Sequence, residues 1–413
     1  MEPRNGSGSS EVTSANGRAA PWRKAGRSPL HGGTSVASLL GQYATGAGIP
    51  LLAGMALYGW RAAATVGLLI GCTAGAAAIW QRIGRRGRQL RMRHCLWLAM
   101  LLGLMLPAHL ASREVLAPVS SFPPWPLIPS AALSLVIMVW MLGGPGSGRV
   151  NPVLTTWLLL FVLFEPMLVS HRVLPVERVF TGDVLESPLP DSSAPAPAAT
   201  KTPWYASRST GATPMYLEPA AQRLLGYTTA VRPERAPRSV PVLLRDEMPP
   251  LENLIIGGDP GPIGASSAAA IIIGGLFLLY RGLIDYKIPL LIVASAFVTI
   301  LILPIPVFIN EQGPQWHWLA FRGGYLTLPA AITFVNYELL ASPLLFMGFF
   351  LATSVAVRPM TRRGRVAFAV VIGVLAAVLQ LYESVSAGPY VALLIASLLT
   401  PVLDRLFEPW PLV

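Results

Sequence analysis

Charged side chains are scarce in this chain of 413 residues: only 12% are Asp, Glu, Lys or Arg, whereas 53% are hydrophobic. Ordinary soluble domains carry about 25% charged residues, so the composition argues against a soluble enzyme. Cysteine is nearly missing as well. The two cysteines, Cys72 and Cys95, form no Cys-x-x-Cys pair, and the five histidines are scattered. Zinc, iron–sulfur and disulfide-framework sites therefore lack ligands in this sequence.

Long apolar runs are abundant instead. Ten segments approach the ~20 residues that a helix needs to cross a bilayer, which predicts an all-α integral membrane protein with about ten transmembrane helices. Several of the segments contain a proline, whose freed carbonyl must find a partner on a neighbouring helix. The predicted spans are 38–59, 62–80, 95–111, 126–142, 152–169, 266–280, 288–309, 337–357, 366–382 and 389–406.

The cations predict the orientation of these spans. If the N-terminus is cytoplasmic, alternate segments place 19 Lys and Arg residues inside and three on the short outer loops. This asymmetry obeys the positive-inside rule and predicts that both termini are cytoplasmic. The formal net charge of +11 is then a topology signal, and it gives no reason to expect nucleic acid as a partner.

A long polar segment divides the chain into two halves of five spans each. The predicted organisation is a disordered cytoplasmic tail (1–36), a first membrane half (37–169), an extracytoplasmic Pro/Ala-rich loop (170–264), a second membrane half (265–406) and a C-terminal tail (407–413). Since each half has an odd number of spans, the second half enters from the opposite face. This is the condition for an inverted-topology repeat.

Two glycine-rich stretches and two acids are candidate features of the membrane part. The stretches 143–148 and 261–264 fit no nucleotide-binding pattern, and we interpret both as tight turns, the second with its backbone close to another segment. Glu165 and Glu338 fall in or beside predicted spans. Because acids within a membrane are costly, both are candidates for an ion or proton pathway. Glu165, near the outer end of its span, is equally consistent with a carboxylate that reaches the membrane interface.

The polar loop contains a distinctive patch at 209–214, with the sequence Ser-Thr-Gly-Ala-Thr-Pro. Small residues precede Thr213 and a proline follows it, so an enzyme could approach and modify this hydroxyl. Taken alone, the patch is a weak signal and is more typical of a plain turn. Its neighbours along the chain give it a second interpretation.

Five further blocks stand out along the chain. They are the glycine-rich turn 143–148 leading to Asn151-Pro152, the stretch 261–281 with Ser266 and Ser267, the stretch Phe349–Thr353, the stretch Pro359–Arg365, and Pro401–Arg405. These blocks resemble the D subunit of the Rnf ion-translocating electron transport complex and the related B subunit of the sodium-pumping NADH:quinone oxidoreductase. They occur in the family's order, and the resemblance covers roughly residues 40 to 406.

The resemblance implies a cofactor. Within the patch Thr210, Gly211, Ala212 and Thr213, the family attaches FMN through its phosphate to the final threonine, here Thr213. A second, noncovalent riboflavin is implied too. The chain departs from the family pattern at Ser207, where an acid is usual, at Ala265 in place of Glu, and at Ser354-Val355 in place of Asp-Pro.

The expected function is that of a membrane subunit in a bacterial inner-membrane complex, rather than a stand-alone enzyme. It would pass electrons through FMN and couple them to ion movement. The implied partners are iron–sulfur, NADH-binding and second flavin subunits, with a flavin transferase for maturation and membrane lipid around the helices. Three alternatives stay open: a flavin-free transporter or channel, a structural subunit whose flavin site has decayed, and a quinone-reducing subunit of the sodium-pump type.

Overall fold

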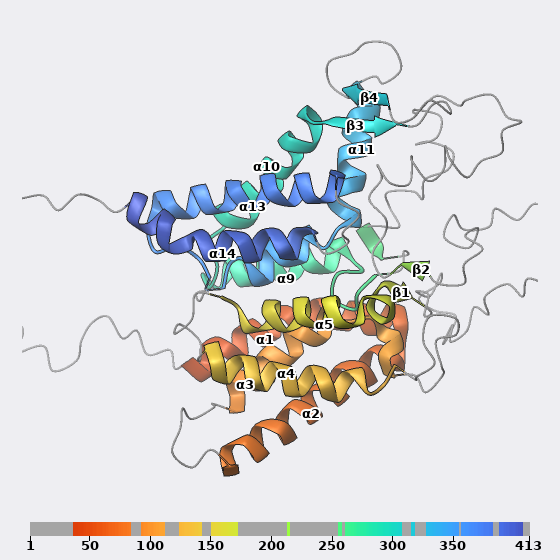
Figure 1. Ribbon diagram of the computed structural model, residues 1–413, viewed down its shortest axis with the longest axis vertical. Helices are drawn as coiled ribbons and strands as arrows, with labels where there is room; N and C mark the ends of the chain where they lie inside the picture. The colour runs from red at the N-terminus through yellow and green to blue at the C-terminus, as the bar shows by residue number, and fades with distance from the viewer. Residues whose placement is uncertain are drawn as a thin grey trace, which may run out of the picture.

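A computed structural model of the chain shows a helical protein whose helices lie side by side in two groups (Figure 1). Helices α1 to α5 form one group, and α9 to α14 form the other. The structure describes residues 36–83, 92–111, 124–142, 150–171, 213–214, 255–257, 261–307, 315–318, 328–354, 357–382 and 388–407.

The described part of the first group contains five helices and one short 3₁₀ helix. Its last helix, α5, leads directly into strand β1, which pairs with the two-residue strand β2 from the long polar segment. The elements are α1 (Val36–Tyr58), α2 (Trp60–Ile83), α3 (Met92–Leu104), η2 (Ala108–Ala111), α4 (Leu127–Leu142), α5 (Pro152–Val169), β1 (Ser170–His171) and β2 (Thr213–Pro214).

The second group repeats this order of elements with an added hairpin. Its third helix, α11, is followed by a short helical turn and a π-helical turn. The elements are α9 (Ala268–Tyr280), α10 (Lys287–Ile302), β3 (Pro304–Val307), β4 (Gln315–Trp318), α11 (Leu328–Ala341), α12 (Leu344–Phe346), η3 (Met347–Leu351), α13 (Arg362–Tyr382) and α14 (Gly388–Leu406).

Helix length and composition identify membrane-spanning candidates among the described residues. Helices α2, α13 and α14 are each long and apolar enough to cross a membrane. Helix α11 together with α12 and η3 passes the same test as a pair bent by 63°. The protein is therefore helical with at least three apolar candidate spans, which agrees with the predicted class of membrane protein.

Two predicted boundaries in the second half are wrong. The span expected over 288–309 ends as helix at Ile302 and continues into the antiparallel hairpin of β3 and β4, in which Pro304 pairs with Trp318. Pro304 and Pro306 explain the difference, because neither has the N–H that a helix requires. The span expected at 337–357 begins as helix at Leu328, so Glu338 lies well inside it.

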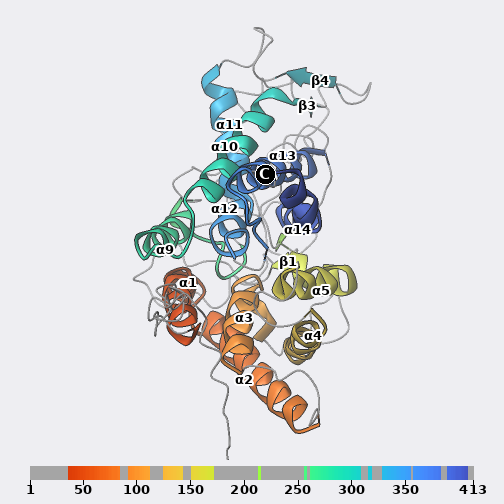
Figure 2. The same cartoon turned by 90° about the vertical axis from the view of Figure 1, so that its left-hand side faces the viewer.

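Two helix pairs join the groups. Helix α1 packs against α9, and α5 packs against α14 (Figure 2). At the first contact the backbones approach closely, since a Cβ atom added to Gly274 would lie 2.6 Å from the carbonyl oxygen of Gly46. Small residues that permit such approach are typical of helix packing in membranes.

Candidate functional site

The sequence-predicted attachment residue, Thr213, lies in strand β2 beside the end of α5. The antiparallel register pairs Thr213 with His171 and Pro214 with Ser170. Because β1 continues directly from α5, the pairing of the two strands holds the backbone of Thr213 beside the end of that helix. The other residues of the predicted patch, Thr210, Gly211 and Ala212, lie outside the described residues.

Glu165 lies just beyond a kink in α5. The backbone at Phe164 is non-helical, with φ −133° and ψ 32°, so the regular helix ends there. Pro166 follows two residues later and has no backbone N–H, so the helical hydrogen bond to the oxygen of Val162 is missing at the kink. The kink leads the chain from the apolar helix into β1.

The third helix of the first group, α3, breaks off near Pro107 and leaves backbone carbonyls to be satisfied by other segments. The oxygen of Leu104 accepts a hydrogen bond from the Gly264 N–H at 2.8 Å, and the oxygen of Leu106 accepts one from the Ile263 N–H at 3.1 Å. Both donors belong to the glycine-rich stretch before α9. The turn predicted at 261–264 is therefore present, and its backbone completes the broken helix.

Tyr58 anchors the same turn to the end of α1. Its hydroxyl donates to the Gly261 oxygen at 3.0 Å and accepts from the Gly261 N–H at 2.9 Å. A Cβ atom added to Gly264 would lie 2.6 Å from Cβ of Leu104. Glycine at this position therefore permits the close approach of the two backbones.

Trp157 of α5 links the break in α3 to the second group. Its ring N–H donates to the oxygen of Met105 at 3.2 Å. Met105 lies between Leu104 and Leu106, so all three carbonyls at the break in α3 accept a hydrogen bond from another segment. The Trp157 ring also lies 4.6 Å from the ring of Tyr390 in α14, measured between centroids. Both side chains are buried.

The third helix of the second group, α11, is also broken, at Ser342 and Pro343. Glu338 lies one turn before the break and is fully buried. The amide nitrogen of Gln380, on α13, donates at 2.6 Å both to the Glu338 backbone oxygen and to Oε2 of its carboxyl group. One side chain of α13 thus contacts both the backbone and the acid at the end of α11.

A π-helical turn follows this second break. The N–H of Ala352 donates to the Met347 oxygen at 2.8 Å, which is the i to i+5 pattern. Such turns are rare in proteins as a whole, but those that occur often lie at functional sites. The break, the π turn and the buried Glu338 therefore lie in one segment of the chain.

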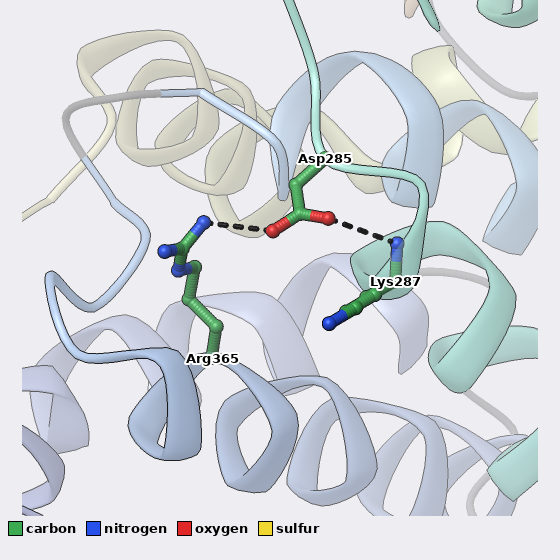
Figure 3. Close-up of polar contacts among 3 residues, drawn as sticks. All are labelled: Asp285, Lys287 and Arg365. Carbon is green, nitrogen blue, oxygen red and sulfur yellow. Dashed lines mark hydrogen bonds and ion pairs between the residues drawn. The ribbon is translucent and has the colours of Figure 1, made fainter.

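At the opposite end of the second group, three segments meet at the start of α13. Asp285 accepts a hydrogen bond from Nη1 of Arg365 at 2.7 Å and from the Lys287 N–H at 3.3 Å (Figure 3). Asp404, near the end of α14, accepts from the N–H groups of Met360 and Thr361 at 3.0 and 3.3 Å. We name this group of contacts the α13 clamp.

Sequence reasoning missed Gln380, Trp157 and Tyr58. Each of these lies in an apolar helix, where one amide or aromatic residue carries no pattern of its own. One feature of the sequence could have pointed to Gln380: it is a lone amide side chain in a long apolar span. Within the described part of the chain, no three His, Cys, Asp or Glu side chains are grouped so as to hold a metal ion.

Comparison with known families gives a match over almost the whole chain. The model of the NQR2, RnfD, RnfE family matches residues 26–412. The D subunit of an ion-translocating oxidoreductase complex from Halorhodospira halophila is 25% identical over 388 residues, which is 93% of this chain and 92% of that protein. A protein of the same description from Aeromonas salmonicida is 25% identical over 365 residues, 87% of this chain and 89% of its own.

A third relative is similar over a shorter region. It is the D subunit of the Na(+)-translocating ferredoxin:NAD(+) oxidoreductase complex of Acetobacterium woodii, and it is 30% identical over 162 residues. That match covers 38% of this chain and 42% of the relative, so the chain spans less than half of the length of this relative.

Proposed function

The chain belongs to the NQR2, RnfD, RnfE family, and we propose that it serves as the D subunit of a membrane-bound, ion-translocating oxidoreductase complex. The observation that carries the proposal is the family match from residue 26 to residue 412. The two relatives that align over most of their length have this description. The apolar helices agree with such a role.

The proposed layout has ten spans in two halves of opposite orientation, with both termini in the cytoplasm and residues 170–264 outside. Two features support it. Helices α1 and α9 open their respective halves and pack against each other, and α5 and α14, which close them, do the same. The third helix of each half is interrupted near a proline, at Pro107 and at Pro343.

We propose that Thr213 carries FMN through a phosphoester on its hydroxyl group. The residue suits the group, because threonine supplies the oxygen for this bond, and the pairing with β1 holds its backbone at the end of α5. When bound, FMN would supply electron transfer. The chain itself provides the attachment point and the strand pair that keeps this point beside the membrane helices. The family resemblance also implies a noncovalent riboflavin.

We propose that Glu338 takes part in the ion step. It is a buried acid on a broken helix, the arrangement in which membrane proteins place residues of ion and proton pathways. Gln380 holds the carboxyl group toward α13 and also caps the backbone at the break. Glu165 is the second candidate, since it lies next to the kink that leads to β1 and β2.

The remaining parts of the reaction belong to partner subunits in this proposal. The sequence has neither a dinucleotide fingerprint nor cysteines spaced for an iron–sulfur cluster. Iron–sulfur, NADH-binding and second flavin subunits would therefore deliver and remove the electrons. A flavin transferase would load Thr213.

The flavin proposal is tested by expressing the full chain together with a flavin transferase. We expect a fluorescent band on a denaturing gel and a mass increase equal to FMN less one water on the peptide that contains Thr213. Thr213→Ala removes the hydroxyl and should abolish both signals, whereas Thr228→Ala, in the same polar segment, should keep them. A dark wild-type band, or fluorescence that persists in Thr213→Ala, would contradict the assignment.

A further inference from the structure

Basic side chains lie on the segments that the α13 clamp joins at one end of the second group. Five cations on the three joined segments have exposed side chains, and they lie at the end of α9, the start of α10, the start of α13 and the end of α14. They are Arg281, Lys287, Arg362, Arg363 and Arg405.

The acids near these five cations already accept hydrogen bonds from other groups. Among the described residues of this end, the only acids are Asp285 and Asp404, and both accept hydrogen bonds within the clamp. The exposed cations are thus left as an excess of positive charge on one surface. Helix stability does not explain Arg362 and Arg363, because cations in the first turn of a helix oppose its dipole.

The surface lies at the ends of two helices that are long and apolar enough to cross a membrane. Arg362 begins one membrane-spanning candidate and Arg405 lies in the last turn of another. Large side chains beside them are exposed as well: Tyr280 is 88% exposed and Met360 is 90% exposed. Aromatic and basic side chains that alternate at span ends are typical of the boundary between lipid tails and headgroups.

We propose that the α13 clamp and its exposed cations form a binding site for the headgroup of an anionic phospholipid. The phosphate would contact Arg362, Arg363 and Lys287, while Tyr280 and Met360 would lie against the upper part of the acyl chains. The clamp contributes by holding the loop 281–287, the start of α13 and the end of α14 together. Basic pockets between transmembrane helices recognise anionic headgroups in this way.

The test uses the full chain, purified in a neutral detergent. We expect phosphatidylglycerol to raise the thermal unfolding temperature by several degrees and to remain bound in native mass spectra, with phosphatidylcholine giving neither effect. The double variant R362Q/R363Q should lower phosphatidylglycerol retention at least fivefold. Arg82→Gln removes an exposed cation in the last turn of α2, outside the clamp, and should change retention less than twofold.

A second variant separates a built site from diffuse attraction. Asp285→Asn makes the protein more positive but removes the ion pair with Arg365 that holds the loop 281–287. The site predicts weaker phosphatidylglycerol retention in this variant, with helical content and elution volume unchanged. Stronger retention would mean that net charge alone attracts the lipid, and it would overturn the proposal.

Two further outcomes would also overturn it. One is an equal thermal shift with inorganic phosphate, which would identify a site for a free anion. The other is unchanged lipid retention in R362Q/R363Q together with loss of co-purifying subunits, which would identify a protein-docking surface.

Discussion

The two halves each interrupt their third helix near a proline, but they repair the interruption with different groups. At the break in α3, the carbonyls of Leu104, Met105 and Leu106 accept bonds from two backbone N–H groups and one indole. At the break in α11, the repair comes from the Gln380 side chain, which also contacts the buried carboxyl of Glu338.

The two breaks differ in whether an ionisable side chain lies at the interruption. The donors at the first break carry no titratable group. The two backbone donors belong to a turn that is fixed by Tyr58 and by close packing against Leu104, and the third is the indole of Trp157 on α5. The second break places an ionisable group beside a rare π turn. We therefore assign a structural role to the first break and propose the ion step at the second.

The largest expected effect on stability comes from removing Trp157. Trp157→Ala deletes the bond to Met105 and the contact with Tyr390, and large-to-small changes of buried aromatics cost about 3–5 kcal/mol. Trp157→Phe keeps a ring but loses the N–H, which should cost about 1 kcal/mol. Unfolding in detergent should rank wild type, Trp157→Phe and Trp157→Ala in that order. Equal stability of the two variants would show that the indole bond to Met105, within the first half, stabilises the protein and that the ring packing against Tyr390, between the halves, does not.

At the second break, two substitutions of Glu338 should separate stability from function. Glu338→Ala leaves a buried amide without its carboxyl partner, at a cost of about 1–3 kcal/mol. Glu338→Gln keeps a similar shape and an oxygen acceptor, so it should fold nearly normally but lose ion translocation in the assembled complex. Ion uptake into vesicles measures the second effect, and normal uptake by Glu338→Gln would exclude the proposed role.

A moderate effect is expected at the first break from Tyr58→Phe. The change removes only the hydroxyl that bonds both backbone groups of Gly261, and a lost buried hydrogen bond costs about 0.5–1.5 kcal/mol. Hydrogen exchange should accelerate in the turn 261–264 and stay unchanged around Glu338. Faster exchange at both breaks would mean that the two repairs are coupled.

The smallest effect is expected from Ser342→Ala at the second break. The Ser342 hydroxyl donates to the Leu339 oxygen at 3.3 Å and accepts from the Leu344 N–H at 3.4 Å, which are long hydrogen bonds. We expect a loss of about 0.5 kcal/mol in thermal or denaturant unfolding. If Ser342→Ala lowers the free energy of unfolding as much as Glu338→Ala does, then Ser342, rather than Gln380, provides the main hydrogen bonds that stabilise this break.

The sequence predicted where most helices would lie, because a long apolar run needs no information from elsewhere to become helical in a membrane. It predicted the segment 152–169 with the bounds that α5 has. It failed at 288–309, where apolar residues continue past the helix into β3. Hydropathy does not distinguish a buried strand from a span, and only the two prolines marked the change.

Of the residues in the candidate site, the sequence selected some and missed the residues that contact them. A local pattern and a family resemblance were enough to select Thr213, and an acid in an apolar run selected Glu338. Gln380 contacts Glu338 from another helix, and His171 pairs with Thr213 across a long stretch of sequence. Such contacts depend on how the helices pack, which no local pattern records.

The sequence by itself determined the membrane class, predicted a two-part division and supplied the prolines near which the third helices break. Each of these follows from local chemistry: apolar length, charge distribution and the missing N–H of proline. The tertiary structure decided which groups satisfy the carbonyls at each break. A buried carbonyl needs a partner but does not specify which one, so packing brought Gly264 and Trp157 to α3, and Gln380 to α11.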